Sequence, residues 1–347
     1  MQFCKWGGIL QGIFTSKVRR SLRRALSILF TISVVGLLLW RASPQKILAL
    51  FHRIIPAWLL LGGIIYGLTN CLRALRVFIL CRREVPGVLV FLPVVFAQSF
   101  LNNLLPARLG EAAFIYFLHS KYRIKWGKGT ALLAVARILD YEVVAFLFLL
   151  SGSFYLTRGW GNQGILLWWA GLILLCTSVF ILFLPWLGKR MFSLVEVAFS
   201  NEPASSSWLR KLNAQLLVGF RYLSGADWRT VISPALFCSL FIWLGTFAWF
   251  HVFLAGLGFH TGFLEVVIGA TFAVLSKALP WLTVGGLGAH ESGWTLGFTL
   301  LGWDIQDAIA SGFAVNLLVL LTSSIYGLLG LAWLQWSSKG FPDFEGS

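Results

Sequence analysis

The sequence carries very little charge for its length. Only 12% of its 347 residues are charged, against roughly 25% in soluble domains, and 58% are hydrophobic. This composition excludes an ordinary water-soluble domain and predicts an all-α protein that crosses a membrane several times. Acidic residues are especially scarce, with 13 Asp and Glu against 28 Lys and Arg, so the net charge is +15.

The sequence also lacks the patterns of common catalytic and metal sites. It contains no HExxH, GxSxG or P-loop motif and no paired acidic metal-binding motif. Its five cysteines are scattered and odd in number. Its five histidines are dispersed, and only His290, beside Glu291, lies in an interrupted apolar segment. We therefore expect no metal, no cofactor and no enzymatic activity.

The basic residues lie in short connections between apolar segments rather than along one soluble face. This distribution argues against a nucleic-acid partner and follows the rule that cytoplasmic loops of membrane proteins are rich in Lys and Arg. It predicts a multi-pass protein of the cytoplasmic (inner) membrane with both termini in the cytoplasm. The segments predicted to be cytoplasmic are 1–24, 81–87, 120–128, 186–230 and 337–347.

A helix needs about 20 apolar residues to cross the hydrocarbon core. The segments that meet this length are 25–41, 56–80, 129–157, 164–185, 231–257 and 306–336. They predict one transmembrane domain over 25–336, preceded by the basic segment and followed by a short tail. Within the loop 186–230, the amphipathic piece 208–223 lies either on the inner leaflet or in a solvated loop.

Two regions, 88–119 and 264–302, are each long enough for two passes but are interrupted by Pro and Gly. We interpret each as a re-entrant hairpin of two short helices. Two ordinary crossings are the alternative. The charge bias requires the first hairpin to enter from the cytoplasm and the second from outside, which is the inverted-repeat plan of many transporters.

The first break contains Pro106, Arg108, Gly110 and Glu111. Ionised side chains at membrane depth indicate a functional site by default. Glu111 opens a short helix, so it either caps that helix or leaves N–H groups free for a lipid phosphate.

The second break repeats this order, and Glu291 has the same two readings as Glu111. Its glycines permit close backbone approach to a ligand. We expect Arg108 and Lys277 to face a common polar cavity that binds the substrate, with both glutamates near its wall. The candidate residues of this break are Lys277, Pro280, Gly285, Gly286, Gly288 and Glu291.

The helix after the first hairpin places Arg137 and Asp140 on one face. They form either a structural ion pair or part of the substrate path. Glu142 points away from Asp140 and needs another partner. Arg73 and Arg76 form a stripe with Asn70 that we expect to reach the phosphates of the inner leaflet.

Four short segments together resemble a known family. They are LPARLGEA at 105–112, ARILD at 136–140, LP…GGLGAHES at 279–292 and YGLLG at 326–330. Over about 25–336 they resemble the flippase-like family built on the transmembrane region of lysylphosphatidylglycerol synthase. The resemblance implies a protein that moves lipids or lipid-linked molecules between leaflets, and we expect it to lack the transferase domain that some members carry.

Two positions depart from the family pattern. Ala136 stands where an acidic residue often precedes the arginine, and Asn316 stands where the last span often has an arginine. We predict a translocator without its own ATPase. Its expected partners are membrane lipids, including anionic or isoprenoid-linked ones, and a lipid-modifying enzyme. The alternatives are a non-catalytic subunit that regulates such an enzyme, and an intramembrane lipid transferase or phosphatase.

Overall fold

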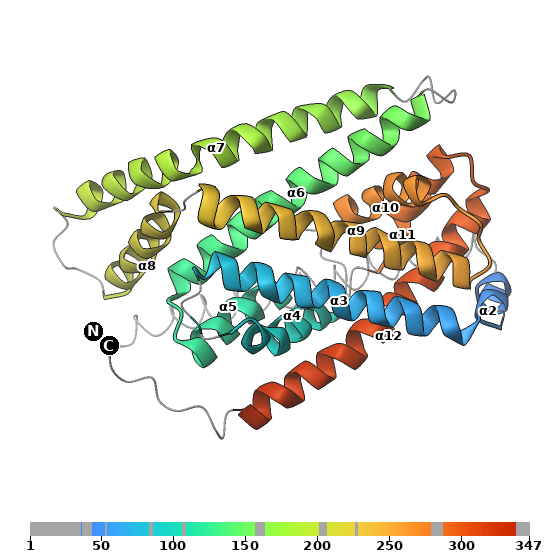
Figure 1. Ribbon diagram of the computed structural model, residues 1–347, viewed down its shortest axis with the longest axis horizontal. Coiled ribbons are helices and arrows are strands. Elements are labelled where there is room, and N and C mark those ends of the chain that lie inside the picture. Colours follow the sequence, from blue (N-terminus) through green and yellow to red (C-terminus); the bar gives the residue numbers. More distant parts are fainter. Residues whose placement is uncertain are drawn as a thin grey trace, which may run out of the picture.

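The computed structural model is a bundle of helices joined by short turns (Figure 1). The predicted all-α class is confirmed, because the described part of the chain contains no strand. The predicted span 25–41 lies outside the described residues, except for Gly36. The structure describes residues 36, 44–52, 54–82, 85, 87–105, 109–156, 164–200, 207–225, 228–278 and 287–337.

Five long helices correspond to the remaining five predicted spans. They are α3 (Pro56–Leu80), α6 (Trp126–Leu156), α7 (Gly164–Ser200), α9 (Ser233–Gly256) and α12 (Ile305–Ser337). Among the described residues, three helices are long and apolar enough to cross a membrane, and a bent pair, Trp168–Leu184 with Trp186–Glu196, makes a fourth if taken as one span. The three unbroken spans are Pro56–Leu80, Thr230–Gly256 and Ile305–Trp336.

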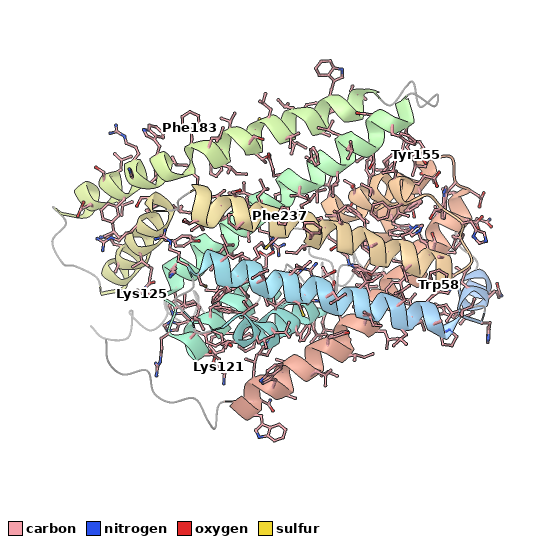
Figure 2. The ribbon with its side chains drawn as sticks, in the orientation of Figure 1. Trp58, Lys121, Lys125, Tyr155, Phe183 and Phe237 are labelled. Carbon is pink, nitrogen blue, oxygen red and sulfur yellow. The ribbon has the colours of Figure 1, made fainter. Side chains whose placement is uncertain are left out.

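The outside of the bundle is apolar. Large side chains such as Phe183 and Phe237 point away from the helices, and more than half of the area of each is exposed (Figure 2). Exposed apolar patches of this extent on a soluble protein would drive association. The apolar exterior is therefore consistent with a bundle surrounded by lipid.

Helices α3 and α9 form a closely packed antiparallel pair. Gly62 faces Phe253, and Gly256 faces Trp58, so that a Cβ atom at either glycine would lie within 2.8 Å of the opposing side chain. Small residues let two helix backbones approach closely inside a membrane. Both hairpins contact this pair, and both also pack extensively on α12.

The first interrupted region forms a hairpin of α4 (Leu92–Leu104) and α5 (Leu109–Tyr122), entered through the short helix η1 (Leu89–Phe91). At its open end, the Tyr122 hydroxyl donates a hydrogen bond to the Val90 carbonyl at 2.5 Å. At its tip, Gly110 lies against the backbone of Asn102. Both ends of this hairpin therefore lie at the same end of the bundle.

The second interrupted region forms a similar hairpin of α10 (Phe263–Ala278) and α11 (Ala289–Leu300). Gly297 packs on the carbonyl of Gly269, which allows the two helices to touch along their length. At the open end, the rings of Phe259 and Trp303 stack with centroids 5.1 Å apart.

The two hairpins point in opposite directions. The open end of α4–α5 lies at the end of α3, where Leu80 and Cys81 share a core with Phe91. The open end of α10–α11 lies at the opposite end of α3, where Leu59 packs in the same core as Phe259 and Trp303. Figure 1 shows the two hairpins at the two ends of the bundle, and the C-terminal ends of α4 and α10 lie toward the middle, at the cavity described below.

Basic and acidic residues are concentrated at opposite ends of the bundle, the same two ends at which the hairpins begin. The end with Lys121 and Lys125 is basic, and the opposite end lies near Trp58 and Tyr155 (Figure 2). There the Tyr155 hydroxyl donates to Glu265 at 2.6 Å. The described basic residues at the first end include Arg82, Lys121, Arg123, Lys125 and Lys128, whereas the second end has Glu265, Asp304 and Asp307.

Four features of the fold add to or differ from the sequence analysis. An additional helix, α2 (Pro44–His52), packs through Leu50 and Phe51 on α12. Helix α7 continues to Ser200, so the first third of the predicted loop 186–230 is helical. The amphipathic piece is α8 (Ser207–Ser224), which packs on α6 and α7, and a solvated loop is therefore excluded. A π-helical turn, η4 (Trp228–Ile232), leads into α9.

Candidate functional site

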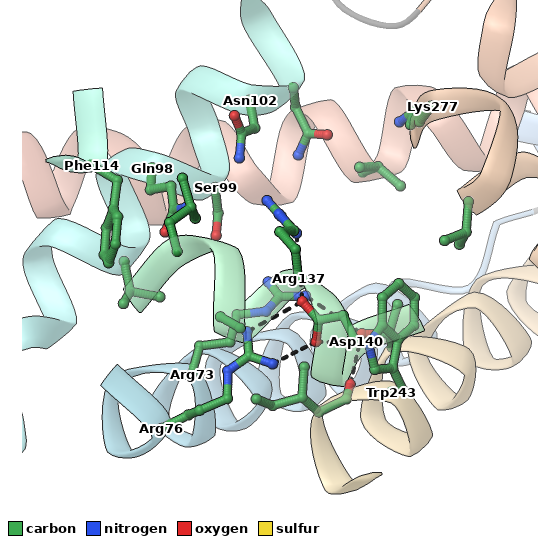
Figure 3. Close-up of a pocket in the computed structure, with 18 of the residues that line it drawn as sticks. Arg73, Arg76, Gln98, Ser99, Asn102, Phe114, Arg137, Asp140, Trp243 and Lys277 are labelled. Carbon is green, nitrogen blue, oxygen red and sulfur yellow. Dashed lines mark hydrogen bonds and ion pairs between the residues drawn. The ribbon is translucent and has the colours of Figure 1, made fainter. Parts of the chain in front are cut away.

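A cavity of about 330 Å³ lies in the middle of the bundle (Figure 3). Its wall is built by α3, α4, α6 and α9 and by the ends of both hairpins, because Asn102 and Asn103 come from the first and Ser276 and Lys277 from the second. The cations in the described part of the wall are Arg73, Arg76, Arg137 and Lys277, and the one acidic residue there is Asp140.

Asp140 on α6 is the centre of a buried polar cluster. The Nη1 and Nη2 atoms of Arg76 lie 2.5 and 3.3 Å from its two carboxylate oxygens. The Trp243 indole donates to the same carboxylate at 2.9 Å, and Arg76 also donates to the Ser239 hydroxyl at 2.7 Å. A buried charge is tolerated only when it is paired and hydrogen-bonded, and this cluster satisfies both conditions with groups from α3, α6 and α9.

Arg137 joins the first hairpin to α6. Its Nη2 atom lies 2.6 Å from Glu111 on α5, and its Nη1 atom lies 3.5 Å from Asp140. The Arg137 side chain is 30% exposed, whereas that of Asp140 is 7% exposed. The predicted Arg137–Asp140 pair exists, but the closer partner of Asp140 is Arg76.

Arg73 faces the cavity from α3, one helical turn before Arg76. Its contacts are with neutral groups, namely Asn70 Oδ1 at 3.3 Å and Thr246 Oγ1 at 3.5 Å. Ser99 of the first hairpin donates to the same Asn70 oxygen at 3.0 Å. The prediction that Arg73 and Arg76 reach the inner-leaflet phosphates is wrong, because both guanidinium groups turn into the protein.

Lys277 belongs to a second polar chain, at the end of α10. Its Nζ atom donates to Asn316 Oδ1 at 3.2 Å, and the Asn316 amide donates to Glu291 Oε1 at 2.7 Å. The other Glu291 oxygen accepts the backbone N–H of Gly288 at 2.7 Å. The capping reading of Glu291 is therefore confirmed, and the same carboxylate is linked through Asn316 to the cavity.

The structure brings together most of the candidates that it describes. Arg137, Asp140 and Lys277 line the cavity, Glu111 contacts Arg137, and Gly110 lies at the tip of the first hairpin. Gly288 and Glu291 lie behind Lys277. The candidates Pro106, Arg108, Pro280, Gly285 and Gly286 lie outside the described residues.

Sequence reasoning missed Arg76, Ser239 and Trp243 as parts of the site. The available signal was the spacing of Asn70, Arg73 and Arg76, which places three polar side chains on one stripe of an otherwise apolar helix. From sequence alone that stripe is compatible with lipid phosphates or with a carboxylate inside the bundle, and the structure shows the second.

Glu142 and His290 do not line the cavity. Glu142 accepts hydrogen bonds from the hydroxyls of Thr177 and Ser178, which fastens α7 to α6 and supplies the partner that the sequence did not name. His290 is buried, and its ring stacks on Trp294 with centroids 5.5 Å apart. Among the described residues, no group of three His, Cys, Asp or Glu is placed to hold a metal.

These features define a class of protein. It is a helical membrane protein in which two hairpins of opposite direction end at an internal, cation-rich cavity. The model of the family named "Lysylphosphatidylglycerol synthase TM region" matches residues 24–338, so the chain belongs to this family. Comparisons with curated proteins and with solved structures find no match.

Proposed function

We propose that this protein moves a membrane lipid or lipid-linked molecule between the two leaflets of the cytoplasmic membrane. The observation that carries the proposal is the cavity itself, which combines four cations with hydroxyl and amide groups inside an apolar bundle. A polar cavity at this depth gives a headgroup a path through the hydrocarbon, while its acyl chains remain in the bilayer.

The lengths of the hairpin helices support re-entrant insertion. They contain 13, 14, 16 and 12 residues. At 1.5 Å per residue, each spans about 18–24 Å, which is less than the roughly 30 Å of a hydrocarbon core. On this proposal the two tips meet near the midplane, as the binding-site helices of inverted-repeat transporters do.

The separation of charge supports an orientation. Cytoplasmic loops are enriched in Lys and Arg, so the end that contains Arg82, Lys121 and Lys125 is cytoplasmic on this proposal, and the end that contains Asp304 is external. Arg108 remains a candidate for the same cavity, since it lies two residues before Gly110.

The proposal assigns no catalytic step to the cavity. The residues described in its wall include neither His nor Cys, and the wall hydroxyls of Ser99 and Thr246 hydrogen-bond to Asn70 and to a backbone carbonyl. Such an arrangement suits binding and passage more than group transfer, which needs an activated nucleophile.

Reconstituted vesicles test the proposal. The purified protein is placed in liposomes that contain phosphatidylglycerol, phosphatidylethanolamine or a polyisoprenyl phosphate carrying a fluorophore on its chain, and dithionite is added outside. Complete quenching of at least one probe, faster than in protein-free liposomes, is the expected result. Quenching limited to the outer leaflet for all three probes would overturn the proposal.

A further inference from the structure

The cations of the cavity are neutralised unequally. Arg76 is paired with Asp140, and Arg137 contacts Glu111 and Asp140. Lys277 is connected to Glu291 through Asn316. Arg73 is the fourth cation, and within the described part of the chain it has no carboxylate within ion-pair distance.

The bonds of Arg73 leave much of its guanidinium group available. Its two contacts, at 3.3 and 3.5 Å, are long for hydrogen bonds and involve only uncharged oxygens. A guanidinium group has five N–H donors in a planar fork that suits a phosphate or carboxylate. Arg73 therefore presents unused donors and an uncompensated charge at the wall of the cavity.

The opposite wall adds neutral donors without adding negative charge. In Figure 3, Asn102 and Lys277 lie across the cavity from Arg73, and Gln98 and Ser99 lie along the same side of the first hairpin as Asn102. An anion between these walls would contact Arg73 on one side and amide or ammonium groups on the other. Charge-assisted hydrogen bonds of this kind are the strongest that a protein forms with an oxyanion.

We infer that the cavity selects lipids whose headgroup is small and carries a net negative charge on a phosphate, with Arg73 as its main contact. The inference rests on the proposed function and names the substrate class of the same cavity. A zwitterionic headgroup brings its own cation into a cavity that already has an excess of positive charge, so it binds less well.

The volume sets the size of the headgroup. About 330 Å³ is near the lower end of the roughly 300–1,000 Å³ range of small-molecule pockets. It accommodates a phosphate with a short polyol and is too small for a long glycan chain. Phosphatidylglycerol is thus a suitable probe, with phosphatidylethanolamine as the zwitterionic comparison and diacylglycerol as the comparison without phosphate.

Lipid retention measured by native mass spectrometry tests the inference directly. Wild-type protein is incubated in detergent with equal amounts of the three lipids, all with the same acyl chains. We expect phosphatidylglycerol to be retained about 10- to 100-fold more than diacylglycerol, as one or two charge-assisted hydrogen bonds to its phosphate would give. It should also be retained more than phosphatidylethanolamine, which has the same phosphate but an ammonium group that the cations of the wall repel. Equal retention of phosphatidylglycerol and phosphatidylethanolamine by the wild type would overturn the inference without any variant.

Variants assign the selectivity to Arg73. Arg73→Gln should remove the preference for phosphatidylglycerol, and Arg73→Lys, which keeps the charge but loses the fork, should retain part of it. The matched control is Arg190→Gln on the exposed surface of α7, which should keep the wild-type preference. Full preference in Arg73→Gln, confirmed as folded by size-exclusion chromatography, would also overturn the assignment.

A free anion in solution could occupy the same site as the phosphate of a lipid. Adding inorganic phosphate or glycerol 3-phosphate in excess should leave retained phosphatidylglycerol unchanged, and displacement by either would assign the site to a free anion. Retention and translocation are separate measurements. Selective retention without translocation would support the inference about headgroup selectivity and contradict the proposed function. Translocation without selective retention would support the proposed function and contradict the inference.

Discussion

Arg76 Nη1 lies 2.5 Å from Asp140 Oδ1, and this contact joins two helices whose paired residues are 64 positions apart. The two side chains are only 9% and 7% exposed. The pair therefore fixes α3 against α6 at the depth of the cavity. It also orients the Asp140 carboxylate, whose second oxygen lies near Arg137.

The first prediction concerns the stability of this pair. Arg76→Leu leaves a buried carboxylate with weaker partners, so the free energy of unfolding should fall by about 3–5 kcal/mol. The double variant Arg76→Leu with Asp140→Leu should recover most of this loss, because no buried charge is left unpaired. Unfolding in detergent, followed by circular dichroism, measures both. A double variant no more stable than Arg76→Leu would contradict the assignment.

The second prediction separates function from stability at Arg137. Because this side chain and Glu111 are 30% and 21% exposed, Arg137→Gln should cost only about 1 kcal/mol of stability, as partly solvated pairs do. We expect translocation to fall strongly nonetheless, since the side chain lines the cavity. Arg190→Gln, measured in the same preparation, should translocate as the wild type does. Normal translocation by Arg137→Gln would remove this residue from the substrate path.

The third prediction concerns orientation. In a cysteine-free background, single cysteines at Lys125 and Asp304 should react from opposite sides of the membrane, with Lys125→Cys accessible from the cytoplasm. Both positions are exposed, and they lie at the basic and acidic ends of the bundle. A membrane-impermeant maleimide applied to intact cells and to inverted vesicles distinguishes the sides. Labelling of both cysteines from one side would eliminate the model of two oppositely inserted hairpins.

The fourth prediction concerns the packing of the second hairpin. A Cβ atom at Gly297 would lie 2.1 Å from the Gly269 carbonyl oxygen, so Gly297→Ala should destabilise the protein by about 1–3 kcal/mol. Gly171, in α7, has no neighbouring atom within 4 Å of such a Cβ. Gly171→Ala should be neutral or stabilise the helix by up to about 1 kcal/mol. Equal midpoints of thermal unfolding for the two variants would contradict this packing.

The positions at which the helices of the two regions end and begin were predicted well, because Pro and Gly have strong local consequences. Their re-entrant insertion stays a prediction. Region 88–119 is broken between Leu104 and Leu109, and region 264–302 is interrupted between Ala278 and Ala289, as the interruptions in the sequence require. The direction in which the charged side chains point was predicted less well. Helix periodicity places Arg76 on a stripe, but it cannot tell whether that stripe meets lipid headgroups or the carboxylate of a helix 64 residues later.

The hydrogen-bond partners of single polar residues could likewise not be predicted from the neighbouring sequence. Nothing near Glu142 indicates that Thr177 and Ser178 would supply its hydrogen bonds, because hydroxyls on an apolar helix are common and usually bond to their own backbone. Similarly, Asn316 was regarded only as a departure from the family pattern. In the structure it connects Lys277 to Glu291 by two hydrogen bonds.

The hydrogen bond from Tyr122 to the Val90 carbonyl has a mechanical consequence. It joins the two sides of the first hairpin at its base, and the close approach of Gly110 to Asn102 joins them at the other end, so α4 and α5 are held together as one unit. The Arg137–Glu111 ion pair connects that unit to α6. On the proposed function, an anionic headgroup that reaches Arg137 would compete with Glu111 for the same guanidinium group, so occupancy of the cavity would weaken the contact between the first hairpin and α6.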